Sequence, residues 1–129
     1  MTSASQDKGD RFERDTVAYF RSHSYHVDRT RAGWSDDRGD VHGVVSRDGR
    51  PFAIECKNHK RQNLSGWLRE LRVEVANSHG RIGALIHKKR GTANPAEQYA
   101  TLPLEWLIEL LKEAGYRCGC QLCSASSQQ

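Results

Sequence analysis

Apolar side chains recur at helical spacing in three parts of the chain. They predict an amphipathic helix from Asp10 to about His23, with Glu13 on a face that can approach a sheet, and a second helix from Leu64 to about Asn77. A third helix is expected from Pro103 to about Ala114, with Gly115 ending it. The second helix carries an apolar stripe that is expected in the core: Leu64, Trp67, Leu68, Leu71 and Val75.

Between these helices the pattern changes to that of strands. Tyr25 to Thr30 is predicted to be a short strand, and the apolar run from Ile82 to Ile86 has the length of a buried strand. Residues 44–54 contain a strand, an Asp-Gly turn and a second strand, a hairpin that brings Asp40 close to Glu55. Residues 91–95 are expected to be a loop. The predicted order is helix, three strands, helix, strand and helix.

Two carboxylates and a lysine flank this hairpin. Side chains two apart on a strand share a face, so Glu55 and Lys57 point the same way while Cys56 points into the core. Mg²⁺ takes oxygen ligands, which makes Asp40, Glu55 and the Cys56 carbonyl candidate ligands. A metal there would activate water and polarise a phosphate, with Lys57 orienting the water or neutralising phosphoryl charge. An ordinary hairpin with a Glu55–Lys57 ion pair is the alternative, and His42 could contact metal or DNA or have a structural role.

Four segments carry a family resemblance: residues 8–14 (KGDRFER), residues 31–38 (RAGWSDDR), the pair Gly39-Asp40, and residues 52–58 (FAIECKN). In this order they resemble the PD-(D/E)xK nuclease superfamily, in particular the archaeal Holliday-junction resolvases and similar phage-encoded enzymes. The resemblance covers roughly residues 8–114. Gly39 stands where the superfamily name expects proline, a change that removes no ligand.

The resemblance implies an α/β, restriction-endonuclease-like domain over residues 9–115, with a mixed central β-sheet flanked by helices and an αβββαβ core. It implies that Glu13 is a third carboxylate at the metal site, directly or through a water, and that Ser35 is a functional serine. The implied activity is a Mg²⁺-dependent endodeoxyribonuclease, with Mn²⁺ able to substitute, acting on Holliday junctions or other branched DNA. Symmetric cleavage of a junction needs two active sites, so a homodimer is expected.

Other functions remain open. The same chemistry would serve a nicking or restriction-type endonuclease, or a repair nuclease for flaps or mismatches. From different classes, the chain could be a catalytically silent DNA-binding module, or an interaction protein that uses its cysteines and its apolar last helix. The intact set of Glu13, Asp40, Glu55 and Lys57 argues against a silent module.

Positive charge gathers around the expected site. Twenty Lys and Arg against 16 Asp and Glu give a net charge of +4 and a pI near 9.0, which suits a polyanionic partner. Trp34 could stack on an unpaired base or anchor its loop by packing. Each basic cluster alone could be a solvated patch, but clusters around one acidic site favour phosphate contacts. The expected contacts are Lys8, Arg29, Arg31, Arg38, Lys60, Arg61, Lys88, Lys89 and Arg90.

The ends of the chain, residues 1–8 and the cysteine-containing residues 116–129, are expected to be flexible. Cys118, Cys120 and Cys123 lack an evident fourth ligand, so no zinc site is predicted. The last helix has more apolar surface than one face needs, which a second subunit or burial within the monomer would cover equally well. No stretch reaches the roughly 20 apolar residues of a membrane span, no signal-peptide core is seen, and a cytoplasmic location is expected.

Overall fold

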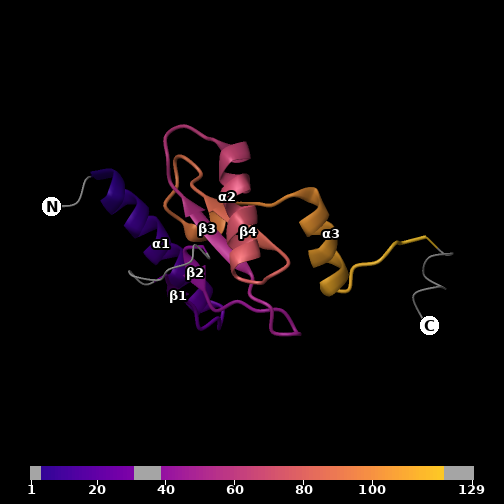
Figure 1. The fold of residues 1–129 in the computed structure, drawn as a ribbon. Helices are drawn as coiled ribbons and strands as arrows, with labels where there is room; N and C mark the ends of the chain where they lie inside the picture. The colour runs from indigo at the N-terminus through magenta and orange to yellow at the C-terminus, as the bar shows by residue number, and fades with distance from the viewer. Residues whose placement is uncertain (1–3, 31–38, 121–129) are drawn as a thin grey trace.

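A mixed β-sheet with helices on both faces organises residues 4–30 and 39–120, which are the residues that the computed structural model describes (Figure 1). Arg31, Trp34, Ser35, Arg38 and Cys123 lie outside the described residues. Along the chain the elements are α1 (Ala4–Ser22), β1 (Asp28–Arg29), β2 (Val41–His42), β3 (Ala53–Lys57), α2 (Leu64–Asn77), β4 (Gly83–His87), the 3₁₀ helix η1 (Pro95–Glu97), β5 (Tyr99–Thr101) and α3 (Leu104–Glu113).

The described strands lie in the sheet in their sequence order, with β3 at the centre. β3 and β4 are parallel, whereas the other neighbouring pairs are antiparallel. A parallel pair needs a crossover connection, and α2 supplies it. In this register Val41 of β2 pairs with Ile54, and Glu55 pairs with Leu85 of β4. The two motif segments therefore lie side by side.

The two faces of β3 bury different side chains because successive strand residues point in opposite directions. Ile54 and Cys56 face α1, in a core with Phe12, Val17, Val27 and Val41. Ala53 faces α2 and α3, in a core with Trp67, Leu71, Val75, Leu85 and Trp106. This arrangement confirms the predicted orientation of Cys56 and the predicted apolar stripe of the second helix. Glu55 and Lys57 share the α2 side with Ala53.

Several predicted boundaries need correction. The first helix begins at Ala4 rather than Asp10, so residues 4–8 are helical. Ala, Gln and Lys favour helix, and an aspartate in the first turn suits the positive end of the helix dipole. The strand predicted from Tyr25 to Thr30 is reduced to Asp28–Arg29. Part of the expected loop after β4 is η1, and the edge strand β5 was not predicted.

Helix α3 ends as its sequence predicts but is covered less than expected. Gly115 adopts φ +86°, and the Tyr116 amide donates to the Leu111 carbonyl at 2.9 Å, which closes the helix end. Trp106 is buried against α2, whereas four apolar side chains of this helix are exposed in the described chain: Leu104, Leu107, Ile108 and Leu111. The part of the monomer that the structure describes therefore leaves these four side chains exposed. No helix of the described ranges has the length and apolar character needed to cross a membrane.

Candidate active site

Backbone hydrogen bonds made by both the amide and the carbonyl of Asp40 fix its position. Its amide donates to the Ile54 carbonyl at 2.7 Å, and its carbonyl accepts from the Thr30 amide at 2.9 Å. Its carboxylate Oδ2 accepts the Cys56 amide at 2.8 Å. The preceding residue, Gly39, has φ +98°, and a Cβ there would lie 2.8 Å from the Ile54 carbonyl oxygen. Proline is fixed near φ −65° and could not adopt this backbone, which explains the glycine physically.

Three carboxylates converge beside β3. The side chain of Asp40 lies within hydrogen-bonding reach of both Glu13 and Glu55. Burial and the negative charge of Glu55 raise the pKa of Asp40 from 3.8 to about 7, although the Cys56 amide opposes the rise. Burial and the charge of Asp40 also raise the pKa of Glu13, with Arg29 opposing. The structure thus places Asp40 beside Glu55, as the hairpin predicts, and Glu13 beside Asp40.

Arg29 contacts the acidic site itself. Its guanidinium donates to Glu13 Oε2 at 2.6 and 2.9 Å and to Asp10 Oδ1 at 2.9 Å. A phosphate contact was expected from this residue, and in the structure its partners are carboxylates of α1. Arg29 thus neutralises part of the charge beside Asp40.

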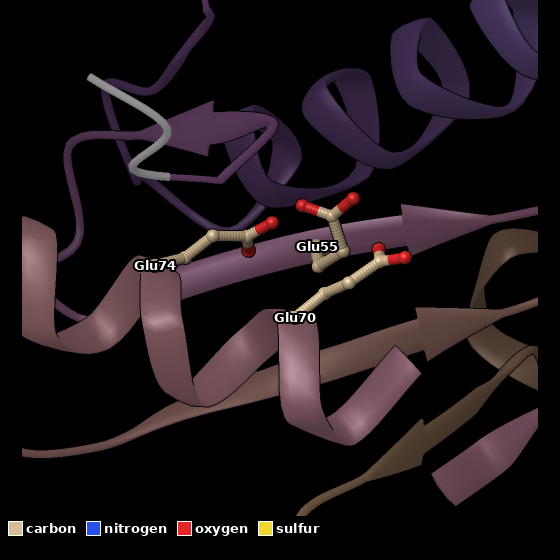
Figure 2. Close-up of side chains that lie close together, drawn as sticks. All are labelled: Glu55, Glu70 and Glu74. Carbon is tan, nitrogen blue, oxygen red and sulfur yellow. The ribbon is translucent and has the colours of Figure 1, made fainter. Parts of the chain in front are cut away.

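Lys57 binds a carboxylate that the sequence reasoning missed. Its Nζ lies 3.5 Å from Glu55 Oε1 and 2.8 Å from Oε2 of Glu70, a residue of α2. Glu70 and Glu74 project from successive turns of α2 toward Glu55 (Figure 2), and carboxylate oxygens of the three lie within 4.8 Å of one another. Burial lowers the pKa of Lys57, but the adjacent Glu70 and Glu55 outweigh it and raise the pKa overall.

The donor set fits a hard divalent cation. The ligand atoms that Asp40, Glu55 and Glu13 offer are all carboxylate oxygens, the type that Mg²⁺, Ca²⁺ and Mn²⁺ prefer. Glu55 is 7% exposed, so its charge is largely removed from water. Burial first, and then the charge of Glu55, raise the pKa of Asp40 to about 7, so both oppose its ionisation. A cation among these oxygens would relieve that repulsion.

A family model described as restriction endonuclease (Mrr_cat) matches residues 5–115. The chain belongs to the restriction endonuclease family. This family is part of the PD-(D/E)xK nucleases, so both the resemblance and the expected α/β fold are confirmed. The protein is accordingly a nuclease of a family that acts on DNA and whose members usually use divalent metals. A search of curated proteins found no match.

Basic residues of this nuclease domain line a pocket beside α1. The pocket has a volume of about 220 Å³ and lies between α1 and the segments that follow β3 and β4. Lys88 Nζ donates to the Thr92 carbonyl, and Arg90 donates to the His59 carbonyl, so these side chains also brace the segments that carry them. Lys60 and Arg61 are exposed in the segment after β3. The charged or amide residues lining the pocket are Lys8, Arg11, Asp15, Asn58, Lys88, Arg90 and Gln98.

His42 and the cysteine segment contribute differently. His42 Nε2 lies 2.5 Å from Thr30 Oγ1 and 3.2 Å from the Gly39 carbonyl, so it links the Thr30 side chain to the Gly39 backbone. This supports the structural alternative for His42. Cys118 and Cys120 are exposed, with their sulfurs 3.2 Å apart.

Proposed function

We propose that this family member is a Mg²⁺-dependent endodeoxyribonuclease, with Mn²⁺ able to substitute, that hydrolyses phosphodiester bonds within DNA strands. The observation that carries the proposal is the convergence of Glu13 from α1, Asp40 before β2 and Glu55 on β3, with Lys57 beside Glu55. Carboxylate triads of this kind concentrate negative charge where a phosphodiester and its counter-ion would meet. A silent DNA-binding module would not need such a cluster of carboxylates that repel one another.

Each residue has a distinct part in the proposed chemistry. Asp40 and Glu55 would hold the cation, with Glu13 contacting it directly or through water and the Cys56 carbonyl as a further oxygen. The cation, when bound, would lower the pKa of a water and polarise the phosphate. Lys57 keeps its positive charge because two carboxylates favour the charged form. Its ammonium would orient the attacking water or offset charge developing on the phosphoryl oxygens.

Phosphate contacts are proposed for the basic residues around the site. Those described are Lys8, Lys60, Arg61, Lys88, Lys89 and Arg90, and Arg31, Arg38 and Trp34 complete the proposed set. Such contacts position a duplex without reading its sequence. Ser35 remains a candidate catalytic residue. A cytoplasmic location is part of the same proposal.

Two substrates are supported by different observations. The motif order along residues 8–58 resembles junction resolvases, which supports a four-way junction cleaved by a homodimer. The exposed apolar side of α3 offers a surface for the second subunit. The family match to restriction endonucleases supports linear duplex DNA as the second candidate.

Cleavage of a labelled four-way junction beside a matched linear duplex tests the proposal, with Mg²⁺ or EDTA and with wild type and Asp40→Asn. Metal-dependent paired nicks in the junction alone, lost in the variant, would support the resolvase. Cutting of both substrates would keep the endonuclease and reject junction specificity. Binding of DNA without cleavage under any metal condition would reject the enzyme and favour the binding module.

A further inference from the structure

The lysine of the motif is held by two carboxylates from different elements. Lys57 Nζ lies 2.8 Å from Glu70 Oε2 on α2, but 3.5 Å from Glu55 Oε1 on its own strand. The side chain of Lys57 is 17% exposed and that of Glu70 is 52% exposed. The closer partner is therefore the surface residue that no motif includes. This contact links the crossover helix to the reaction site.

A bound cation would change the balance between these two partners. Glu55 would then share its negative charge with the cation, and the cation would repel the ammonium of Lys57, since like charges repel. Lysine is a flexible point charge on a four-carbon stem, so Glu55 alone would hold it weakly. Glu70 would still offer a carboxylate at hydrogen-bonding distance, 2.8 Å from Nζ.

Helix α2 gives Glu70 a fixed position. The Asn63 side chain caps the helix start by accepting the Gly66 amide at 3.2 Å. Leu71, the residue next to Glu70, is fully buried, and Trp67 one turn earlier is 6% exposed. A side chain on a helix locked into the core in this way is placed more reproducibly than one on a loop.

We propose that Glu70 is a positioning residue that holds the ammonium of Lys57 at the reaction site, an inference that rests on the proposed nuclease function. Glu70 acts through Lys57 and contacts neither the phosphate nor the reacting water. Its negative charge would by itself repel DNA, so simple electrostatics predicts that removing the charge favours DNA binding and does not slow cleavage. A positioning role predicts instead that removing the charge slows cleavage. That difference in sign makes the inference testable.

The test compares Glu70→Gln with Glu105→Gln on the DNA that wild type cleaves. Glu105 is the matched control, because it forms an exposed ion pair of the same 2.8 Å length with Arg72 away from the site. We expect Glu70→Gln to lower kcat by about tenfold to a hundredfold with KM unchanged or lower, since small misplacements of a catalytic group are costly. Glu105→Gln should retain wild-type kcat. A Glu70→Gln variant with lower KM and wild-type kcat would overturn the inference.

A double-mutant cycle separates positioning from an independent role. If Glu70 acts through Lys57, adding Glu70→Gln to Lys57→Ala should cause no further loss of kcat. Additive losses would show that Glu70 acts independently of Lys57 and would overturn the inference. An increase in the Mg²⁺ concentration that Glu70→Gln needs for half-maximal rate would identify Glu70 as a metal ligand and would also overturn it.

Nitrogen-15 NMR of lysine ammonium groups in the metal-free protein provides a readout without activity. Lys57 should give a resonance protected from solvent exchange in wild type and in Glu105→Gln, and Glu70→Gln should lose it. Retention in Glu70→Gln would overturn the inference. Absence of cleavage by wild type would instead reject the nuclease proposal, and the NMR result would still decide the Lys57–Glu70 contact.

Discussion

Asp40 and Cys56 join the two halves of the nuclease motif through one hydrogen bond, in which the Cys56 amide donates to Asp40 Oδ2 at 2.8 Å. The donor belongs to the peptide between Glu55 and Cys56, so the carboxylate of Asp40 is tied to the strand that carries the second ligand. The bond orients the Asp40 carboxylate, which also lies within hydrogen-bonding reach of Glu13 and Glu55. The geometry of the site is thus set by the backbone of β3 as well as by side chains.

Gly39 should not tolerate the proline that the superfamily name suggests. Gly39→Ala places a Cβ 2.8 Å from the Ile54 carbonyl in a backbone of φ +98°, and Gly39→Pro cannot adopt that φ at all. We expect a loss of about 1–3 kcal/mol in the free energy of unfolding for alanine and more for proline. Gly49→Ala is the control, because it shares the positive φ without a contact within 4 Å and should cost less. Urea denaturation measures these values, and equal costs at both sites would contradict the clash.

Arg29 should stabilise the fold through Glu13 in a pH-dependent way. Arg29→Gln leaves Glu13 beside Asp40 without its cation, and we expect a loss of about 1–2 kcal/mol near pH 7 for hydrogen bonds to a charged, partly exposed group. At pH 4 Glu13 is largely protonated because its pKa is raised, so the loss should shrink. Thermal unfolding at the two pH values tests this. Arg81→Gln, which breaks an exposed pair with Asp48, should cost less at pH 7, and an equal cost would reject the prediction.

The sequence predicts the frame of the site well, because its main signals are local. The apolar stripe on α2 marks a helix whose observed bounds, Leu64–Asn77, agree with the prediction. The Asp-Gly turn placed Asp40 beside Glu55. Strand β5 was not predicted because it is a short edge strand. Tyr99 is 46% exposed, and the strand lacks the alternation of buried and exposed residues that would indicate it.

The contacts of the charged residues could not be predicted from the sequence, because they depend on the tertiary structure. A guanidinium binds phosphate and carboxylate alike, so the sequence did not show that Arg29 would contact Glu13. Glu70 reaches Lys57 only because the crossover places α2 over that side of β3, a tertiary relationship. Glu74 did carry a signal, since it lies three residues after Leu71 on the buried side of the helix.

Asp40 should make the metal-free protein less stable as the pH rises. Its pKa is about 7 in the folded state and near 3.8 when unfolded, so between these values the folded state binds more protons. Stability therefore falls from about pH 4 to pH 7 and levels off above. Asp40→Asn, which stays neutral but can still accept the Cys56 amide, should be more stable than wild type at pH 8 and nearly equal at pH 3. Thermal unfolding in EDTA measures the difference. A variant less stable at pH 8 would contradict the raised pKa.

Mg²⁺ should reverse the difference in stability between wild type and Asp40→Asn at pH 8, so that wild type becomes the more stable protein. A ligand that binds only the folded state raises its stability by mass action, and Asp40 is a proposed ligand. Wild type should gain several degrees in Tm from millimolar Mg²⁺ at pH 8, whereas Asp40→Asn should gain little. An equal gain in both proteins would place the cation elsewhere.

Lys8 and Lys88 should contribute to DNA affinity without contributing to the chemical step. Both line the pocket beside α1, and Glu13, Asp40 and Glu55 do not line it, so we expect the two lysines to contact backbone phosphates rather than the reacting one. Replacing either by alanine should weaken DNA binding at low salt and reduce the salt dependence of the binding constant by about one counterion per lost contact. Cleavage at saturating DNA should keep its wild-type kcat.

Lys112→Ala on α3 is the control and should leave affinity unchanged. Fluorescence anisotropy over a salt series measures the slopes, and a fall in kcat for Lys8→Ala would show that this pocket belongs to the reaction site itself.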